Sequence, residues 1–140
     1  MTVIDASVAL KWVLDEEDGV EAARELLRDP EKLTAPSFWL LEAGSALWRR
    51  HRRSLLSPGE AFGKLAFLAK VPLRAVDVSE LADAALRLSI ELQHPIYDCT
   101  YLALALRDDL PIVTADQKFA AVIVRGGYGG RLRLIGPDQP

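Results

Sequence analysis

Four acidic residues stand in segments that otherwise have the composition of a protein interior. Acidic side chains are seldom buried without a partner. Four carboxylates that converge would repel one another, so they would need a cation to be stable together. The acids are Asp5, Glu42, Asp98 and Asp116, which fall in the apolar segments 2–7, 40–44, 95–100 and 112–116.

Three of these acids also have a purely structural interpretation. Asp5 and Asp116 are suited to be N-caps of the helices expected after them, because their oxygens accept hydrogen bonds from free backbone N–H groups. Asp98 would complement the dipole at the start of a helix. Glu42 resists this interpretation, since it shares a helical face with Phe38 and would be costly there unless that face lines a cavity. The four acids together therefore favour a site assembled by the fold.

Ligands that are all carboxylate oxygens are typical of Mg²⁺ or Mn²⁺ sites. Such a cation lowers the pKa of a bound water and stabilises charge on a phosphate. Zinc is disfavoured because His51 and His94 are the only histidines and neither has ligand spacing with Cys99. Ser7 and Thr114 offer hydroxyls that could orient a carboxylate or a metal-bound water, or instead bond a nearby backbone group.

A basic run follows Trp48 at the end of the helix expected to carry Glu42. One interpretation is a solvated helix end that complements the dipole. The other is a phosphate-binding patch close to the acids, which would make RNA contacts. The formal net charge is −3, so any binding to nucleic acid must come from such a local patch. The run consists of Arg49, Arg50, His51, Arg52 and Arg53.

The composition predicts one globular domain spanning residues 1–140. The chain is 50% hydrophobic and 26% charged, which is typical of a folded protein with a real core. Its single cysteine fits a reducing compartment. The N-terminus lacks the pattern of a signal peptide, and no apolar run approaches the roughly 20 residues that span a bilayer. These features predict a soluble cytoplasmic protein.

Short β-prone runs alternate with helical patterns along the chain. This alternation predicts an α/β three-layer sandwich, with a mainly parallel sheet of four to five strands and helices on both faces. In such sheets, sites form at the carboxyl ends of the strands, where the acids fall. Ser57 and Glu60 predict a capping box, and Ser79 predicts another helix start. Strands are expected at 2–4, 32–35, 73–78, 110–114 and 131–135, and helices at 7–14, 18–28, 36–50, 57–70, 79–93, 97–107 and 117–124.

Four segments around the acids resemble those of PIN-domain proteins, especially the VapC-type toxins of toxin–antitoxin pairs. The resemblance covers nearly the full length in the right order. The last part departs from it, because residues 122–130 are glycine-rich where relatives usually run more directly into the last strand. The segments are VIDASVALKW at 3–12, LEAGSAL at 41–47, YDCTYLALA at 97–105 and IVTAD at 112–116.

This resemblance implies a PIN-like fold and a Mg²⁺- or Mn²⁺-dependent ribonuclease. Asp5, Glu42 and Asp98 would form the core acidic triad, Asp116 a fourth acid, and Thr114 the hydroxyl near that acid. In-line attack by water on an RNA phosphodiester would leave a 5′-phosphate and a 3′-hydroxyl. The resemblance also implies a homodimer and a small cognate antitoxin of the VapB type that blocks the site.

Two other functions compete with this one. A PIN-shaped regulator that binds RNA or protein without cleaving would have the same fold, but the presence of all four acids argues against lost activity. A signalling receiver domain also carries acids at strand ends. It needs an adjacent acidic pair, whereas Ala6 and Ser7 follow Asp5, and Lys118 is poorly placed to contact a phosphoryl group.

Overall fold

The computed structural model describes residues 1–15 and 18–136. Strands and helices alternate along these residues, as the sequence predicts. None of the described helices is long and apolar enough to cross a membrane. In chain order the elements are β1 (Thr2–Ile4), α1 (Ala6–Leu10), α2 (Val20–Leu27), η1 (Pro30–Lys32), β2 (Leu33–Pro36), α3 (Trp39–Arg52), α4 (Pro58–Ala69), β3 (Arg74–Val76), η2 (Val78–Glu80), α5 (Ala82–Leu92), α6 (Ile96–Asp108), β4 (Ile112–Thr114), α7 (Gln117–Arg125), η3 (Gly129–Arg131) and β5 (Leu132–Leu134).

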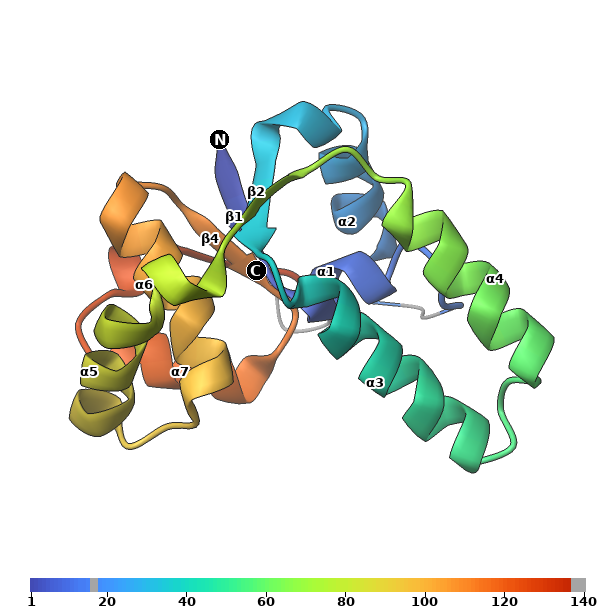
Figure 1. Ribbon diagram of the computed structural model, residues 1–140. Coiled ribbons are helices and arrows are strands. Elements are labelled where there is room, and N and C mark those ends of the chain that lie inside the picture. Colours follow the sequence, from blue (N-terminus) through green and yellow to red (C-terminus); the bar gives the residue numbers. More distant parts are fainter. Residues whose placement is uncertain (16–17, 137–140) are drawn as a thin grey trace.

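The five strands form one sheet in the order β3-β2-β1-β4-β5, and every neighbouring pair is parallel. Parallel neighbours need a crossover connection, which is almost always right-handed. The chain moves from β1 to β3 in one direction and then returns to β4 and β5, so its helices divide between the two faces. Figure 1 shows α5, α6 and α7 on one side of the sheet and α1, α2, α3 and α4 on the other. The predicted α/β sandwich with a parallel sheet is confirmed.

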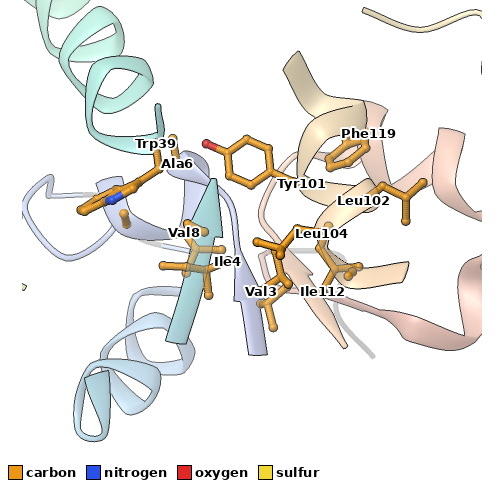
Figure 2. Close-up of a cluster of buried hydrophobic side chains, with 14 of the residues drawn as sticks. Val3, Ile4, Ala6, Val8, Trp39, Tyr101, Leu102, Leu104, Ile112 and Phe119 are labelled. Atoms are coloured by element: carbon orange, nitrogen blue, oxygen red, sulfur yellow. The ribbon is translucent and has the colours of Figure 1, made fainter. Parts of the chain in front are cut away.

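The core lies around the central strands β1 and β4. Figure 2 shows Val3, Leu104 and Ile112 packed together between the sheet and α6. Residues 99–105 of α6 are all buried, because this helix is covered by the sheet on one side and by α5 on the other. A helix that is apolar almost all round is expected in such a place. The burial of α6 fixes the position of its first turn, which carries Asp98.

Helices α3 and α4 pack against each other and extend away from the sheet (Figure 1). The predicted capping box begins α4: Ser57 Oγ accepts from the Glu60 N–H and Glu60 Oε1 accepts from the Ser57 N–H, both at 3.1 Å. The basic run at 49–53 lies at the far end of α3. Glu42 lies at the near end, in the first turn beside the sheet.

Two local predictions are wrong. Helix α1 ends at Leu10 instead of Leu14. The turn that follows it is held by two hydrogen bonds, from Lys11 Nζ to the Asp18 carbonyl before α2 and from Trp12 Nε1 to the Ala23 carbonyl within α2. Ser79 does not cap a helix with its side chain.

The Asp77 carboxylate instead accepts from the Ser79 N–H and begins the 3₁₀ helix η2. Helix α5 starts only at Ala82 and has no side-chain cap. Helix α7 confirms the helix predicted at 117–124, and the glycines after it lead through a turn into the 3₁₀ helix η3, after which β5 pairs with β4. The sheet is therefore complete at this edge, although β5 is shorter than the predicted 131–135.

Candidate active site

All four predicted acids line one pocket of about 160 Å³. Strands β1 and β4 are parallel neighbours, so Asp5 and Asp116 meet at the same edge of the sheet. The first turns of α3 and α6 bring Glu42 and Asp98 to that edge. We call this space the acid pocket. Its other lining residues are Ala6, Ser7, Leu10, Ala46, Arg49 and Tyr101.

Asp5 is the most buried of the four acids, with 5% of its surface exposed. Both of its carboxylate oxygens accept a hydrogen bond from a hydroxyl group. Ser7 Oγ donates to Oδ1 and Thr114 Oγ1 donates to Oδ2, each at 2.5 Å. Oδ1 also accepts from the Val8 N–H at 3.3 Å, so Asp5 is the N-cap of α1 as well. The two interpretations of Asp5 are therefore compatible. Of the alternatives open for Ser7 and Thr114, the structure shows both hydroxyls bonded to a carboxylate, that of Asp5.

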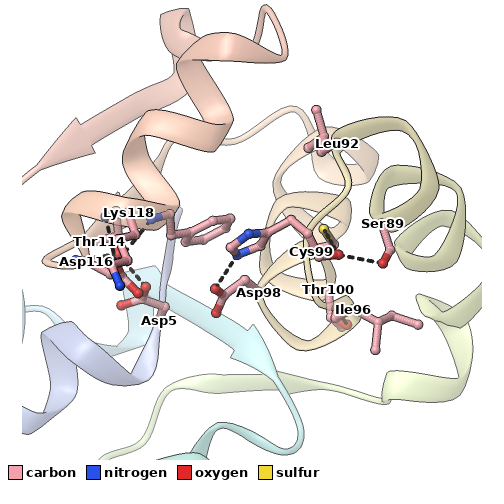
Figure 3. Close-up of polar contacts among 12 residues, drawn as sticks. Asp5, Ser89, Leu92, Ile96, Asp98, Cys99, Thr100, Thr114, Asp116 and Lys118 are labelled. Atoms are coloured by element: carbon pink, nitrogen blue, oxygen red, sulfur yellow. Dashed lines mark hydrogen bonds and ion pairs between the residues drawn. The ribbon is translucent and has the colours of Figure 1, made fainter.

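Both hydroxyls are themselves held in place by the backbone. Ser7 Oγ accepts from the Ala115 N–H at 2.9 Å, and Thr114 Oγ1 accepts from the Asp116 N–H at 3.0 Å. Their protons are therefore directed at Asp5 while their oxygens face the backbone after β4. Figure 3 shows Asp5, Thr114 and Asp116 together at this edge, with the Asp98 carboxylate on the side that faces them.

Glu42 is fixed by a residue that the sequence did not indicate. Tyr101 is fully buried, and its hydroxyl donates to Glu42 Oε1 at 2.6 Å. Figure 2 shows the ring of Tyr101 in the core, with its hydroxyl on the side of Ala6 and Trp39. Tyr101 lies one helical turn after Asp98, on the same face of α6. That spacing was the signal that could have identified it.

Asp98 is also held by a residue outside the predicted set. His94 Nε2 lies 2.7 Å from Asp98 Oδ2. The His94 ring is held in turn by stacking on Phe119, with the ring centroids 5.8 Å apart and the planes 7° from parallel. His94 had been considered only as a zinc ligand. Its spacing of four residues before Asp98 could have shown the contact.

Asp116 uses one oxygen as the N-cap of α7. Its Oδ1 accepts from the N–H groups of Lys118 and Phe119, at 2.9 and 3.1 Å. The structural interpretation of this acid is therefore correct, and Asp116 also lines the acid pocket. Lys118 is exposed on α7 and does not line the pocket.

Burial, with neighbouring acids adding to it, raises the pKa of Asp5, Glu42 and Asp98. Burial is the main cause for Asp5, whose pKa rises to about 6 although the Ser7 and Thr114 hydroxyls oppose this, and the charge of Asp98 adds to it. Burial also raises the pKa of Glu42, with Asp98 again adding. The pKa of Asp98 is raised by burial and by Asp116, against the opposing contact with His94. A cation in the acid pocket would favour the ionised form of all these groups.

The oxygens of the acid pocket suit a hard divalent cation by their chemistry. Within residues 1–15 and 18–136, however, no three His, Cys, Asp or Glu side chains are arranged so that they could hold a metal ion together. The hydrogen bonds described above use Oε1 of Glu42, Oδ2 of Asp98 and Oδ1 of Asp116. The four acids thus share a pocket while each carboxylate is bound to its own neighbours. Small side-chain rotations would be needed for them to share one ion.

The arginines of the basic run lie in different places. Arg49 lines the acid pocket, and its guanidinium donates to Ser45 Oγ at 3.1 Å. Arg50 and Arg53 line a second pocket, of about 330 Å³, that shares Arg49 with the acid pocket. The Arg52 guanidinium instead lies over the Trp48 ring, 5.0 Å from its centroid. Three of the four arginines, Arg49, Arg50 and Arg53, therefore line the acid pocket or the pocket next to it, and Arg52 lines neither.

Comparisons with known proteins agree with this architecture. The chain is 28% identical to ribonuclease VapC12 of Mycobacterium tuberculosis over 135 residues, which cover 96% of this chain and 99% of that protein. The crystal structure of PAE2754 from Pyrobaculum aerophilum superposes with a TM-score of 0.67 at 22% identity, covering 90% of this chain and 96% of that one. VapC20 of M. tuberculosis, a toxin that cleaves the sarcin–ricin loop, gives a TM-score of 0.65 at 18% identity and covers 86% of this chain and 94% of its own. These two superpositions show the shared fold.

The family itself is shown by sequence. Residues 2–124 match the sequence profile of the PIN domain. This region contains the sheet up to β4 and all four acids of the acid pocket. The chain belongs to the PIN domain family.

Proposed function

We propose that this chain is a toxin ribonuclease that hydrolyses RNA phosphodiester bonds at the acid pocket, with Mg²⁺ or Mn²⁺ as cofactor. The observation that carries the proposal is the meeting of Asp5, Glu42, Asp98 and Asp116 in one pocket from four separate parts of the chain. The likeness to VapC12, a ribonuclease, over nearly the whole of both chains supports the reaction. The fold shared with the VapC20 toxin is consistent with the same role.

The four acids would hold the cation. When bound, it would lower the pKa of the attacking water and offset the charge that develops on the phosphate. Ser7, Thr114, Tyr101 and His94 would keep the carboxylates in position through the hydrogen bonds described above, as outer-shell partners of a metal site do. None of these four hydroxyl or imidazole groups needs to contact the RNA.

The reaction itself would be an in-line displacement at phosphorus. A water molecule attacks, the bond from phosphorus to the 3′-oxygen breaks, and the products carry a 5′-phosphate and a 3′-hydroxyl. One carboxylate of the acid pocket accepts the proton that the water loses, and the leaving 3′-oxygen gains a proton. Arg49, which reaches the acid pocket, would contact a phosphate of the RNA, with Arg50 and Arg53 farther along the backbone.

By likeness to the VapC proteins, we also propose partners for this chain. A VapB-type antitoxin would block the acid pocket, and the toxin would act as a homodimer in the cytoplasm on RNA. The arginine side of the pocket would accept acidic groups of an antitoxin as readily as phosphates. Co-expression with a VapB-type antitoxin, followed by a cleavage assay of the purified pair, would test this part.

The test of the reaction is cleavage of total cellular RNA with Mg²⁺ or Mn²⁺, followed by mapping of the fragment ends. Wild type is compared with Asp5→Asn and with Asp83→Asn, which changes an exposed acid on α5. We expect wild type and Asp83→Asn to cleave and Asp5→Asn to be inactive while its circular dichroism is unchanged.

Two results would contradict the proposal. Cleavage that persists in excess EDTA would exclude a metal-dependent reaction. RNA binding by wild type without any turnover in Mn²⁺ would favour the alternative, a catalytically silent PIN-fold regulator.

A further inference from the structure

A second hollow adjoins the acid pocket on the α3–α6 side. Its volume is about 420 Å³, and it shares Glu42 and Arg49 with the acid pocket. We call it the aromatic groove. Two of its apolar side chains are open to solvent, Leu41 at 79% and Tyr97 at 61% exposed. The lining residues are Phe38, Leu41, Glu42, Ser45, Arg49 and Tyr97.

Three aromatic rings form a row from the surface to the site. Tyr97 lies beside Phe38, with centroids 6.0 Å apart, and Phe38 lies beside the buried Tyr101 at 5.5 Å. Tyr101 in turn donates to Glu42. The exposed ring of Tyr97 therefore packs on Phe38, and Phe38 packs on the tyrosine that holds Glu42. Tyr97 also directly precedes Asp98 in the first turn of α6, so its position is fixed by the same buried helix.

The sizes of the two hollows limit what each could hold. At about 160 Å³ the acid pocket is smaller than the roughly 300–1,000 Å³ of typical small-molecule sites, so it has room for a cation and the oxygens of a phosphate. A nucleotide whose phosphate enters it must place its base outside. The aromatic groove is large enough for a base and begins at the acid pocket itself, at Glu42 and Arg49.

We propose that Tyr97, backed by Phe38, stacks on an unpaired base next to the phosphate that is cut, so that the enzyme selects single-stranded or looped RNA at this position. This inference rests on the proposed ribonuclease function. Proteins that recognise single strands place bases on aromatic side chains beside cationic groups that hold the backbone. The groove offers both, because Arg49 lines the groove together with the aromatic rings and also lines the acid pocket. A surface that served only to bind another protein through apolar contacts would not need an arginine that also lines the acid pocket.

The experiment measures binding of a fluorescein-labelled RNA decamer pool of random sequence, in the cleavage-deficient Asp5→Asn background with Mg²⁺. A second probe is an abasic decamer with the same sugar–phosphate backbone. Tyr97→Ala removes the ring, Tyr97→Phe keeps it, and Phe67→Ala removes an exposed ring of α4 that lies outside the acid pocket and the aromatic groove. We expect Tyr97→Ala to weaken binding of the base-containing RNA by roughly 5-fold or more.

The abasic probe isolates the stacking contact. Tyr97→Ala should leave its binding unchanged, Tyr97→Phe should restore binding of the base-containing RNA, and Phe67→Ala should have no effect on either probe. Equal weakening of both probes, or no weakening of either, would overturn the stacking inference. So would a Tyr97→Ala protein that binds RNA normally but changes its oligomeric state, since the groove would then be a protein interface.

The two proposals fail in different ways. If wild type cleaves total RNA and Tyr97→Ala loses no binding, only the inference about the base is wrong. If wild type cleaves no RNA under any metal condition, the proposed function fails first. A 2-aminopurine placed in the decamer gives an independent signal, because stacking on the ring at position 97 should quench its fluorescence with Tyr97 or with Tyr97→Phe but not with Tyr97→Ala.

Discussion

The Tyr101 hydroxyl donates to Oε1 of Glu42 at 2.6 Å and joins α6 to α3 at the acid pocket. The contact crosses 59 positions of sequence and connects a fully buried ring to a half-buried acid. A hydrogen bond to a charged acceptor is worth more than a neutral one, about 1.5–3 kcal/mol. Glu42 is therefore held in its rotamer by the core of the protein and not by its own helix.

Tyr101→Phe should lower activity by about 10-fold or more, as the loss of an outer-shell partner does at metal sites. The hydrogen bond opposes the rise in the pKa of Glu42, so its loss should move the acid limb of the pH–rate profile to higher pH. Tyr128→Phe is the matched control, since the Tyr128 hydroxyl contacts Glu91 at 3.2 Å on the surface. Rate measurements over a pH series would contradict the account if both variants behaved alike.

Thr114→Val should reduce activity because it removes the proton donated to Asp5 and the acceptor of the Asp116 N–H. Thr34→Val is the control, since Thr34 is equally buried but bonds to Arg74 and lies outside the acid pocket. Each change removes hydrogen bonds made by a buried hydroxyl, so each should lower the free energy of unfolding by about 1–3 kcal/mol. Only Thr114→Val should lower the cleavage rate, and Thr114→Ser, which keeps the hydroxyl, should restore it.

The metal-free protein should become less stable relative to Asp5→Asn as the pH rises. The pKa of Asp5 is raised from 3.8 to about 6, so its stabilising contribution is complete below pH 3.8 and is lost as the pH rises through about 6. This difference between the two pKa values of Asp5 corresponds to roughly 3 kcal/mol in the free energy of unfolding. Urea unfolding of both proteins in EDTA between pH 4 and 8 measures it. A difference in unfolding free energy that does not grow with pH would show that Asp5 is not strained by its charge.

Arg49→Ala should weaken RNA binding far more than Arg52→Ala. Arg49 lines the acid pocket, whereas the Arg52 guanidinium is turned over Trp48 on the same helix. If Arg49 contacts a phosphate, its loss should reduce the dependence of log K on log salt by about one. Binding titrations at several salt concentrations would test this. An equal slope for both variants would place the RNA elsewhere.

The fold could be predicted because its signals are local. Apolar runs that end at Asp5 and Asp116 mark strands, and the alternation with helices requires parallel pairing. The edge of the sheet where sites form then follows from topology alone. The boundaries were less predictable, because contacts outside each element decide them: the turn after Leu10 is held by a hydrogen bond from Trp12 to α2, and η2 replaces the cap expected at Ser79.

The acids could be predicted for the same reason, whereas their partners could not. Asp5 and Asp116 carry their own sequence context, but Tyr101 looks like an ordinary residue of an apolar helix and His94 like one of the connection before it. Their roles depend on how α6 rotates against α3 and α7, and packing in three dimensions sets that rotation. The arginine run shows the same limit, since Arg49, Arg50 and Arg53 line pockets whereas Arg52 lies over Trp48, and only the structure separates Arg49 from Arg52.

The central claim is that the four acids share one divalent cation. Crystals soaked in Mn²⁺ and measured at a wavelength where manganese scatters anomalously test it most directly. The account predicts an anomalous peak in the acid pocket, roughly 2.0–2.5 Å from oxygens of Asp5 and Asp98, with Glu42 or Asp116 close by. Asp98→Asn crystals should lose or weaken this peak. A wild-type map with no peak in the acid pocket, or with manganese bound only elsewhere, would contradict the claim.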